Sequence, residues 1–155
     1  MTHYRVDKRL FAIGDEITTA QEYYDKFDGT RKAVEDMLES RRPDGKEPRT
    51  SCLFVFEEEV CAKKHWSMMK DGKLYQVAID EARVFHRGDM AIMDEMKIIV
   101  EAEKDIGAAA DAYWRGEVGN KPVIEIMVSS AIVTDIISTS DEERLAHLKE
   151  RYPIK

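Results

Sequence analysis

Cysteine is scarce in this sequence, and the two cysteines present form no recognisable motif. Cys52 and Cys61 do not have the close spacing of a Cys-x-x-Cys redox or zinc pair. No apolar segment of the signal type stands at the N-terminus, so we expect both residues to be free thiols in a reducing cytoplasm. A thiol–imidazole pair with His65 or His86 is the alternative, but the sequence offers it no third orienting group.

Long apolar runs and an excess of positive charge are also missing. No stretch approaches the roughly 20 apolar residues of a membrane helix, so we expect no membrane partner. The net charge is −7, from 24 basic and 31 acidic residues. Such a protein gains no general attraction to phosphate backbones, which argues against broad nucleic-acid binding. A local basic patch in one loop keeps that function open: Arg41, Arg42, Lys46 and Arg49.

The common catalytic signatures are absent as well. The sequence contains no P-loop, no Gly-x-Gly-x-x-Gly, no Gly-x-Ser-x-Gly and no His-Glu-x-x-His. The Glu-x-x-His pairs of a metal-binding helix bundle are missing too, so no metal site is expected. With 155 residues, the chain has the size of a single domain, residues 1–155.

The residues that are present predict strands separated by helices, an α+β fold. Aromatic and β-branched residues between turn signals mark the strands. We expect them at Thr2–Val6, Ser51–Phe56, residues 73–80, Val123–Val128 and Ala131–Ile137, with Asp15–Thr19 as a loop or short strand. The segment 41–50 holds two prolines and a glycine and is predicted to be an exposed loop.

Helical periodicity predicts the remaining elements. Apolar residues three and four positions apart favour helices at Asp28–Ser40 and residues 57–69. In the second of these, Val60, Cys61, Lys64 and Met68 are predicted to pack inward. Asp89–Trp114 reads as one long helix that Gly107 divides. Ser140, with Glu143 three residues later, predicts the cap of a last helix.

The long helical segment carries two stripes of side chains. Met90, Met93 and Met96 recur at helical spacing and are predicted to fill the core. Its acidic residues are predicted to lie in water: Asp89, Asp94, Glu95, Glu101, Glu103 and Asp105. The aromatic pair Tyr113–Trp114 either anchors the end of the helix or forms the wall of a pocket.

Glu125 is the most informative single residue. It stands in the apolar run Val123–Val128, and a period of two places it on the same strand face as Val123 and Met127. A carboxylate among apolar neighbours indicates either a functional site or a charge that protects an edge strand from aggregation.

In their order, these segments resemble small bacterial ADP-ribosyltransferases, both the rifampin-modifying enzymes and the DNA-modifying toxins. THYRVDKRLFAIGDEI resembles the opening of that family, with a histidine on the first strand and a turn at Leu10–Asp15. SCLFVFEEEVCAKKHW and GKLYQVAID resemble its central strand, helix and strand. KPVIEIMV resembles the late strand that carries the catalytic glutamate. The resemblance spans His3 to about Ile137.

The resemblance implies a fold and a set of residue roles. It implies a split β-sheet core with flanking helices and NAD as the substrate. His3 would bond a hydroxyl of the adenosine ribose, and Tyr4 and Trp66 would join it in binding NAD. Phe54 would stack on nicotinamide in place of the family's tyrosine, with Phe56 as the alternative. The hydroxyl of that tyrosine is lost here.

Glu125 is then expected to be catalytic. It would bond the 2′-hydroxyl of the nicotinamide ribose and stabilise the positive charge that develops when the nicotinamide bond breaks. The resemblance does not name the acceptor, which is a protein, a nucleic acid or a small molecule. Two alternatives remain: a non-catalytic binding or interaction module on the same fold, and an unrelated acidic α+β protein.

Overall fold

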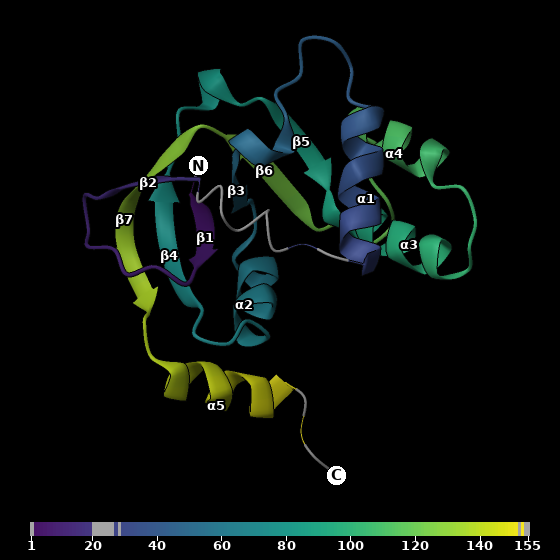
Figure 1. The fold of residues 1–155 in the computed structure, drawn as a ribbon. Helices are drawn as coiled ribbons and strands as arrows, with labels where there is room; N and C mark the ends of the chain where they lie inside the picture. The colour runs from purple at the N-terminus through teal and green to yellow at the C-terminus, as the bar shows by residue number, and fades with distance from the viewer. Residues whose placement is uncertain (1, 20–26, 28, 152, 154–155) are drawn as a thin grey trace.

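A strongly twisted antiparallel sheet organises the molecule (Figure 1). The computed structural model describes residues 2–19, 27, 29–151 and 153. The strands are β1 (His3–Asp7), β2 (Glu16–Thr18), β3 (Leu53–Phe56), β4 (Lys73–Ala78), β5 (His86–Asp89), β6 (Ile124–Val128) and β7 (Ser130–Ser138). The α-helices are α1 (Gly29–Ser40), α2 (Glu59–Ser67), α3 (Met90–Glu101), α4 (Gly107–Trp114) and α5 (Asp141–Arg151), and two 3-10 turns are η2 (Arg49–Ser51) and η3 (Glu81–Arg83). The predicted α+β class is confirmed.

The sheet consists of two wings joined at a narrow junction. Its strand order in the described residues is β2-β7-β4-β1-β3-β6-β5. At the centre, β1 and β3 share one register pair, Tyr4 opposite Phe56, whereas β1 and β4 are paired from His3 to Asp7. One apolar cluster contains residues from both wings, including Val55, Val77 and Ile126, and no helical residue. The inner faces of the two wings therefore pack against each other.

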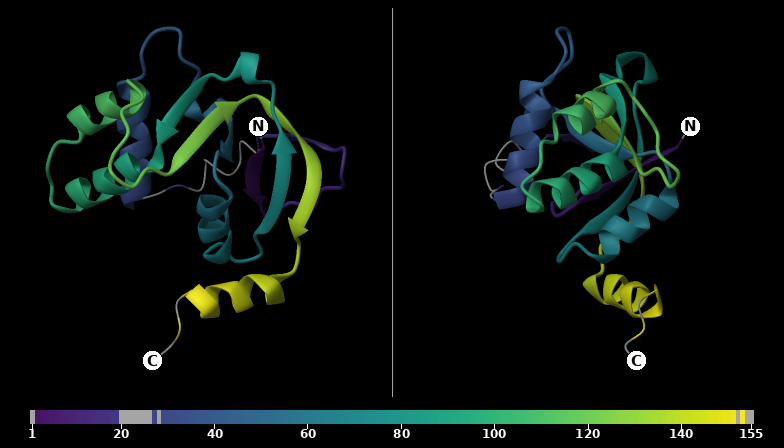
Figure 2. Two further views of the ribbon diagram at one scale, coloured as in Figure 1. Left: turned by 180° about the vertical axis from the view of Figure 1, so that it is seen from behind. Right: turned by 90° about the vertical axis from the view of Figure 1, so that its right-hand side faces the viewer.

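The helices cover the other face in two groups (Figures 1 and 2). The helices α1, α3 and α4 lie together beside β5 and β6, and their core includes Leu38, Met96 and Trp114. The helix α2 lies against β1, β3 and β4, and α5 packs on α2. Among the described residues, no helix is both long enough and apolar enough to cross a membrane. The helix α2 contacts both β1 and β3 and therefore lies over the junction between the wings.

Several predicted features of the helices are confirmed. The long helical segment is divided as expected, and Gly107 begins α4. Met93 and Met96 are buried in the core. The Ser140 hydroxyl accepts a hydrogen bond from the Glu143 amide and so caps α5. For α1, the predicted first residue, Asp28, lies outside the described residues.

The predicted packing face of α2 is wrong for Val60, Lys64 and Met68, and only Cys61 of the predicted residues packs against the apolar cluster. Val60 and Met68 are 58% and 67% exposed, whereas Ala62, Trp66 and Ser67 are buried. The large indole of Trp66 decides the orientation, because it buries more apolar area than any other side chain of this helix and its Nε1 donates to the Gly72 carbonyl at 3.0 Å.

The strand β5 was missed, and Asp89 was placed wrongly. His86–Asp89 is short and polar, so its sequence gives no strand signal. Asp89 ends this strand instead of lying in water on a helix, and its side chain is fully buried. Its two oxygens accept hydrogen bonds from the amides of Ala91 and Val123 at 2.9 Å and of Gly119 at 3.0 Å. This carboxylate thus joins β5, the start of α3 and the segment before β6.

Replacement of Asp89 by alanine is expected to lower the free energy of unfolding by about 3 kcal/mol or more, because three backbone amides lose a buried, charged acceptor. Urea unfolding of the purified variant measures this. Asp94→Ala is the matched control, since that side chain is 71% exposed and pairs with Lys97 on the surface of the same helix. Equal effects of the two substitutions would contradict the role of Asp89.

Candidate functional site

A cavity of about 280 Å³ opens where β1 and β3 part. Beyond Tyr4 and Phe56 the two strands no longer pair, and the Phe54 carbonyl accepts instead from Arg5 Nη1 at 2.9 Å. Five cationic side chains and two carboxylates line the cavity among the described residues: Arg5, Lys8, Arg9, Arg31, Arg49, Asp7 and Glu125. The walls also include Phe54, Phe56, His65, Met69 and Met90. In a chain of net charge −7, this local excess of cations favours an anionic ligand.

Glu125 lines the cavity and is 4% exposed. On the sheet it stands between Phe56 of β3 and Gly88 of β5. Its Oε1 atom accepts from Tyr113 Oη at 2.7 Å and from Arg49 Nη1 at 2.6 Å. Both bonds go to the same oxygen. The predicted edge-strand role is wrong, because β6 pairs with β3 and β5 and is an inner strand.

Gly88 makes the position of Tyr113 possible. A Cβ atom at residue 88 would lie 2.6 Å from Tyr113 Cζ, which is closer than any real contact. The missing side chain lets the phenol lie on β5 with its hydroxyl at Glu125. Burial, and then the charge of Glu125, raises the pKa of Tyr113 well above its usual value, so the phenol stays protonated and remains a donor.

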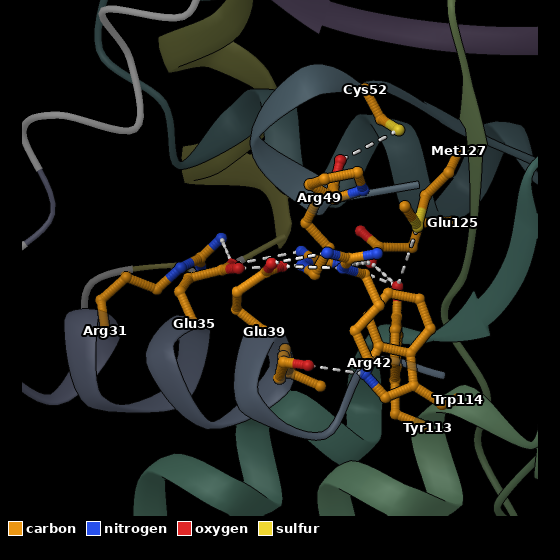
Figure 3. A network of polar contacts seen from close by, with 12 residues as sticks. Arg31, Glu35, Glu39, Arg42, Arg49, Cys52, Tyr113, Trp114, Glu125 and Met127 are labelled. Carbon is orange, nitrogen blue, oxygen red and sulfur yellow. Dashed lines mark hydrogen bonds and ion pairs between the residues drawn. The ribbon is translucent and has the colours of Figure 1, made fainter. Parts of the chain in front are cut away.

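Arg49 lies between two carboxylates, Glu35 and Glu125 (Figure 3), and two aromatic rings also contact it. Its Nε and Nη2 atoms donate to Glu35 at 2.9 and 3.2 Å, while Nη1 donates to Glu125. The guanidinium carbon lies 4.4 Å from the Phe54 ring centroid and 5.2 Å from that of Tyr113. Burial lowers the pKa of Arg49, but the negative charges of Glu125 and Glu35 raise it well above its usual value. The side chain is therefore a permanent cation.

Asp7 holds two further arginines at the cavity. Its buried carboxylate accepts from Arg5 Nε and Nη2 at 3.0 and 2.9 Å, and from Arg9 Nε and Nη2 at 3.0 and 2.9 Å. Burial raises the pKa of Asp7, but the Arg9 hydrogen bond and the Arg5 charge lower it below its usual value. The Arg5–Asp7–Arg9 cluster is thus a preorganised pair of guanidinium groups around an ionised carboxylate.

His65 adds a neutral group to the wall. Its ring lies 5.3 Å from that of Phe56. Burial, together with the charges of Arg5 and Arg31, lowers the pKa of His65, so the imidazole is uncharged at neutral pH. The ring therefore adds an aromatic surface to the cavity and no further charge.

The structure brings together three of the residues predicted for the site. Phe54, Phe56 and Glu125 all line the cavity. Tyr4 stands opposite Phe56 on the same sheet face and packs beside it without lining the cavity. His3 is paired with Val77, whose side chain belongs to the cluster between the wings, so the pleat turns His3 to the opposite face from Glu125.

Trp66 is likewise not among the described residues that line the cavity. It is buried between α2 and the sheet and packs in a cluster with Phe56 and Leu74. Its role in this structure is to fill the core beneath the cavity wall.

Most of the charged side chains in the cavity were missed from the sequence. Arg5, Asp7 and Arg9 follow one another at a period of two, and this alternation is a signal that they share one strand face. No local signal marks Glu35 as a partner of Arg49 or Tyr113 as a partner of Glu125, because these side chains come from α1 and α4. Tyr113 and Trp114 are buried in the core and do not line the cavity, so the pair anchors the end of α4, as in the first of the two interpretations.

The predicted basic loop does not present a patch of unpaired cations. Arg41 pairs with Asp111 and Arg42 with Glu39, at 3.2 and 2.9 Å. Lys46 Nζ contacts the Phe85 carbonyl and His86 Nδ1, and Arg49 is buried. This weakens the argument for nucleic-acid binding through the loop.

The cysteines are free thiols, as expected. Burial raises the pKa of Cys52 to about 11 and also raises the pKa of Cys61. A thiol in that state is a poor nucleophile at neutral pH, which argues against a thiol–imidazole pair. Within the described residues, no group of three or more His, Cys, Asp or Glu side chains is arranged to hold a metal ion.

Comparison of the chain with protein-family models and with curated proteins found no match.

Gly88→Ala is expected to lower the free energy of unfolding by about 1–3 kcal/mol, because the new methyl group collides with the Tyr113 ring. Urea unfolding measures the change. Gly119→Ala is the control, since a Cβ there would make an ordinary contact of 3.6 Å with Asp89. Adding Tyr113→Ala removes the ring, so the double variant should lose no further stability from the methyl group. Additive losses would contradict the direct contact.

Proposed function

We propose that this protein transfers ADP-ribose from NAD to an acceptor. The observation that carries the proposal is the position of Glu125, a buried carboxylate that lines a cation-rich cavity together with Phe54 and Phe56. Each kind of group complements one part of NAD. The carboxylate suits the reacting ribose, the aromatic faces suit the flat nicotinamide ring, and the guanidinium groups suit the diphosphate.

Two groups of lining residues suit different parts of that substrate. Phe54 and Phe56 offer flat faces near Glu125 for nicotinamide. The Arg5–Asp7–Arg9 cluster offers guanidinium groups for the diphosphate. The narrow junction of the sheet separates β1 from β3 and leaves room between them. This supports the split-sheet architecture of ADP-ribosyltransferases as part of the proposal.

Glu125 would act on the developing charge. When the bond between C1′ and nicotinamide breaks, its electron pair leaves with the neutral nicotinamide and the ribose becomes cationic. A fixed carboxylate stabilises that cation more than it stabilises the ground state. Tyr113 directs Oε1 through its hydrogen bond. An acceptor nucleophile then bonds to C1′ and loses its proton to solvent. Water serves as acceptor where no other is present.

One observation favours a second candidate, a non-catalytic NAD-binding module. Both hydrogen bonds to Glu125 come from the protein itself, from Arg49 and Tyr113. A carboxylate engaged in this way has a structural partner already. On this second reading Glu125 holds the core together, and the cavity binds NAD without cleaving it.

Glu125→Gln is expected to reduce nicotinamide release from NAD by about 10²–10³-fold, because the amide no longer offers a negative charge to the ribose cation. Release is measured by chromatography with the purified protein, and NAD binding by calorimetry. Glu117→Gln is the control, since Glu117 is exposed and pairs with Arg115. NAD binding without release in the unmodified protein would favour the second candidate. Absence of NAD binding would overturn both.

Asp7→Asn is expected to weaken ADP-ribose binding by about tenfold, although it removes a negative charge from a cationic site. The reason is that the amide accepts fewer hydrogen bonds, so Arg5 and Arg9 lose their fixed orientation. Calorimetry with ADP-ribose measures the change. Asp44→Asn removes the same charge from an exposed loop and is expected to have no effect. Tighter binding in Asp7→Asn would show that charge alone governs the site.

A further inference from the structure

We infer that Arg49 is a built-in competitor for the nicotinamide end of the cavity, and that its guanidinium must withdraw before NAD is fully seated. The inference rests on the proposed function and adds to it an autoinhibitory contact within the chain. We call this group the guanidinium plug: the Arg49 guanidinium in contact with Phe54, Tyr113, Glu35 and Glu125. The plug fills the place where the flat cationic ring of NAD would be bound.

The plug matches the chemistry of the group that it would exclude. Oxidised nicotinamide is planar and carries one positive charge, and so does a guanidinium. Arg49 lies 4.4 Å from the Phe54 ring, and its Nη1 is 2.6 Å from Glu125 Oε1. A nicotinamide that stacks on Phe54 with its ribose at Glu125 needs the same ring face and the same carboxylate. The two cations therefore cannot occupy the site together.

When Arg49 withdraws, Glu35 and Glu125 each keep another polar partner. Arg31 Nη2 is already 3.4 Å from Glu35 Oε1. In the described part of the chain, the buried Nε of Arg31 has no hydrogen-bond acceptor, so it is a spare donor next to Glu35. Glu125 keeps the hydrogen bond from Tyr113. Withdrawal of Arg49 therefore leaves neither carboxylate buried alone, which lowers the cost of opening.

The position of Arg49 in the chain also permits the movement. It follows the exposed segment 41–48, which contains Pro43, Gly45 and Pro48, and it begins the short turn η2. Its guanidinium is joined to the backbone by a long chain of rotatable bonds. The segment is attached to β5 through Lys46, which contacts the Phe85 carbonyl and His86 Nδ1.

Two ligands separate this inference from the proposed function. NAD contains nicotinamide and competes with the plug, whereas ADP-ribose lacks that ring and binds through its diphosphate and adenosine. Arg49→Gln is expected to raise the affinity for NAD by about tenfold or more, because the open state no longer has to be selected from a minor population. The affinity for ADP-ribose should change by less than about twofold. Calorimetry with each ligand measures both.

Two further variants control for folding and for charge. Arg42→Gln removes an arginine of the same loop that pairs with Glu39 outside the cavity, and it is expected to leave both affinities unchanged. Arg49→Lys keeps the positive charge but has no flat face and no fork of donors, so a smaller rise in NAD affinity is expected. It also provides the test if Arg49→Gln fails to fold, which thermal unfolding reveals.

The outcomes are distinct. Tighter NAD binding with unchanged ADP-ribose binding, in either folded Arg49 variant, supports the plug. Unchanged or weaker NAD binding, with ADP-ribose bound normally, overturns the plug and leaves the proposed function standing. Failure of NAD and ADP-ribose to bind to any variant or to the unmodified protein overturns the proposed function and the plug together.

Discussion

The buried ion pair between Glu125 and Arg49 is the interaction on which the rest of the site depends. Two opposite charges out of water are stable only where further hydrogen bonds satisfy them, and Glu35 and Tyr113 supply those bonds. These four residues come from β6, η2, α1 and α4. The pair thereby holds the helical layer and the sheet in one arrangement, and any ligand that uses Glu125 must compete with Arg49.

Two small features of β5 make this arrangement possible. Gly88 leaves the space that the Tyr113 ring occupies, and Asp89 joins the strand to the start of α3 and to the segment before β6. A larger residue at 88 or a neutral one at 89 would move the elements that carry Tyr113 and Glu125. The short polar strand thus governs the geometry of the site, although its own sequence does not resemble a strand.

The cavity follows from the way in which the sheet divides. The strands β1 and β3 share only the Tyr4–Phe56 pair, and beyond it each strand presents backbone groups without a strand partner. Arg5 bonds the Phe54 carbonyl across the gap, and Asp7 fixes Arg5 and Arg9 beside it. A cationic cavity in an acidic protein is therefore a direct consequence of the separation of the two wings.

Local patterns in the sequence determined the α+β class, most of the helices and strands, the core methionines and the unusual character of Glu125. These depend on periodicity and on neighbours within a few residues, and such signals are complete in the sequence. The resemblance to ADP-ribosyltransferases, and no local pattern, predicted that Phe54, Phe56 and Glu125 share one site, and all three line the cavity. Only the tertiary structure decided which residues contact the buried pair of Glu125 and Arg49, namely Tyr113 and Glu35. It also decided the buried state of Asp89 and the orientation of His3 away from Glu125. Each depends on which strands become neighbours and on what fills the space between them, and residues 76 and 12 positions away from Glu125 meet it only after the chain has folded.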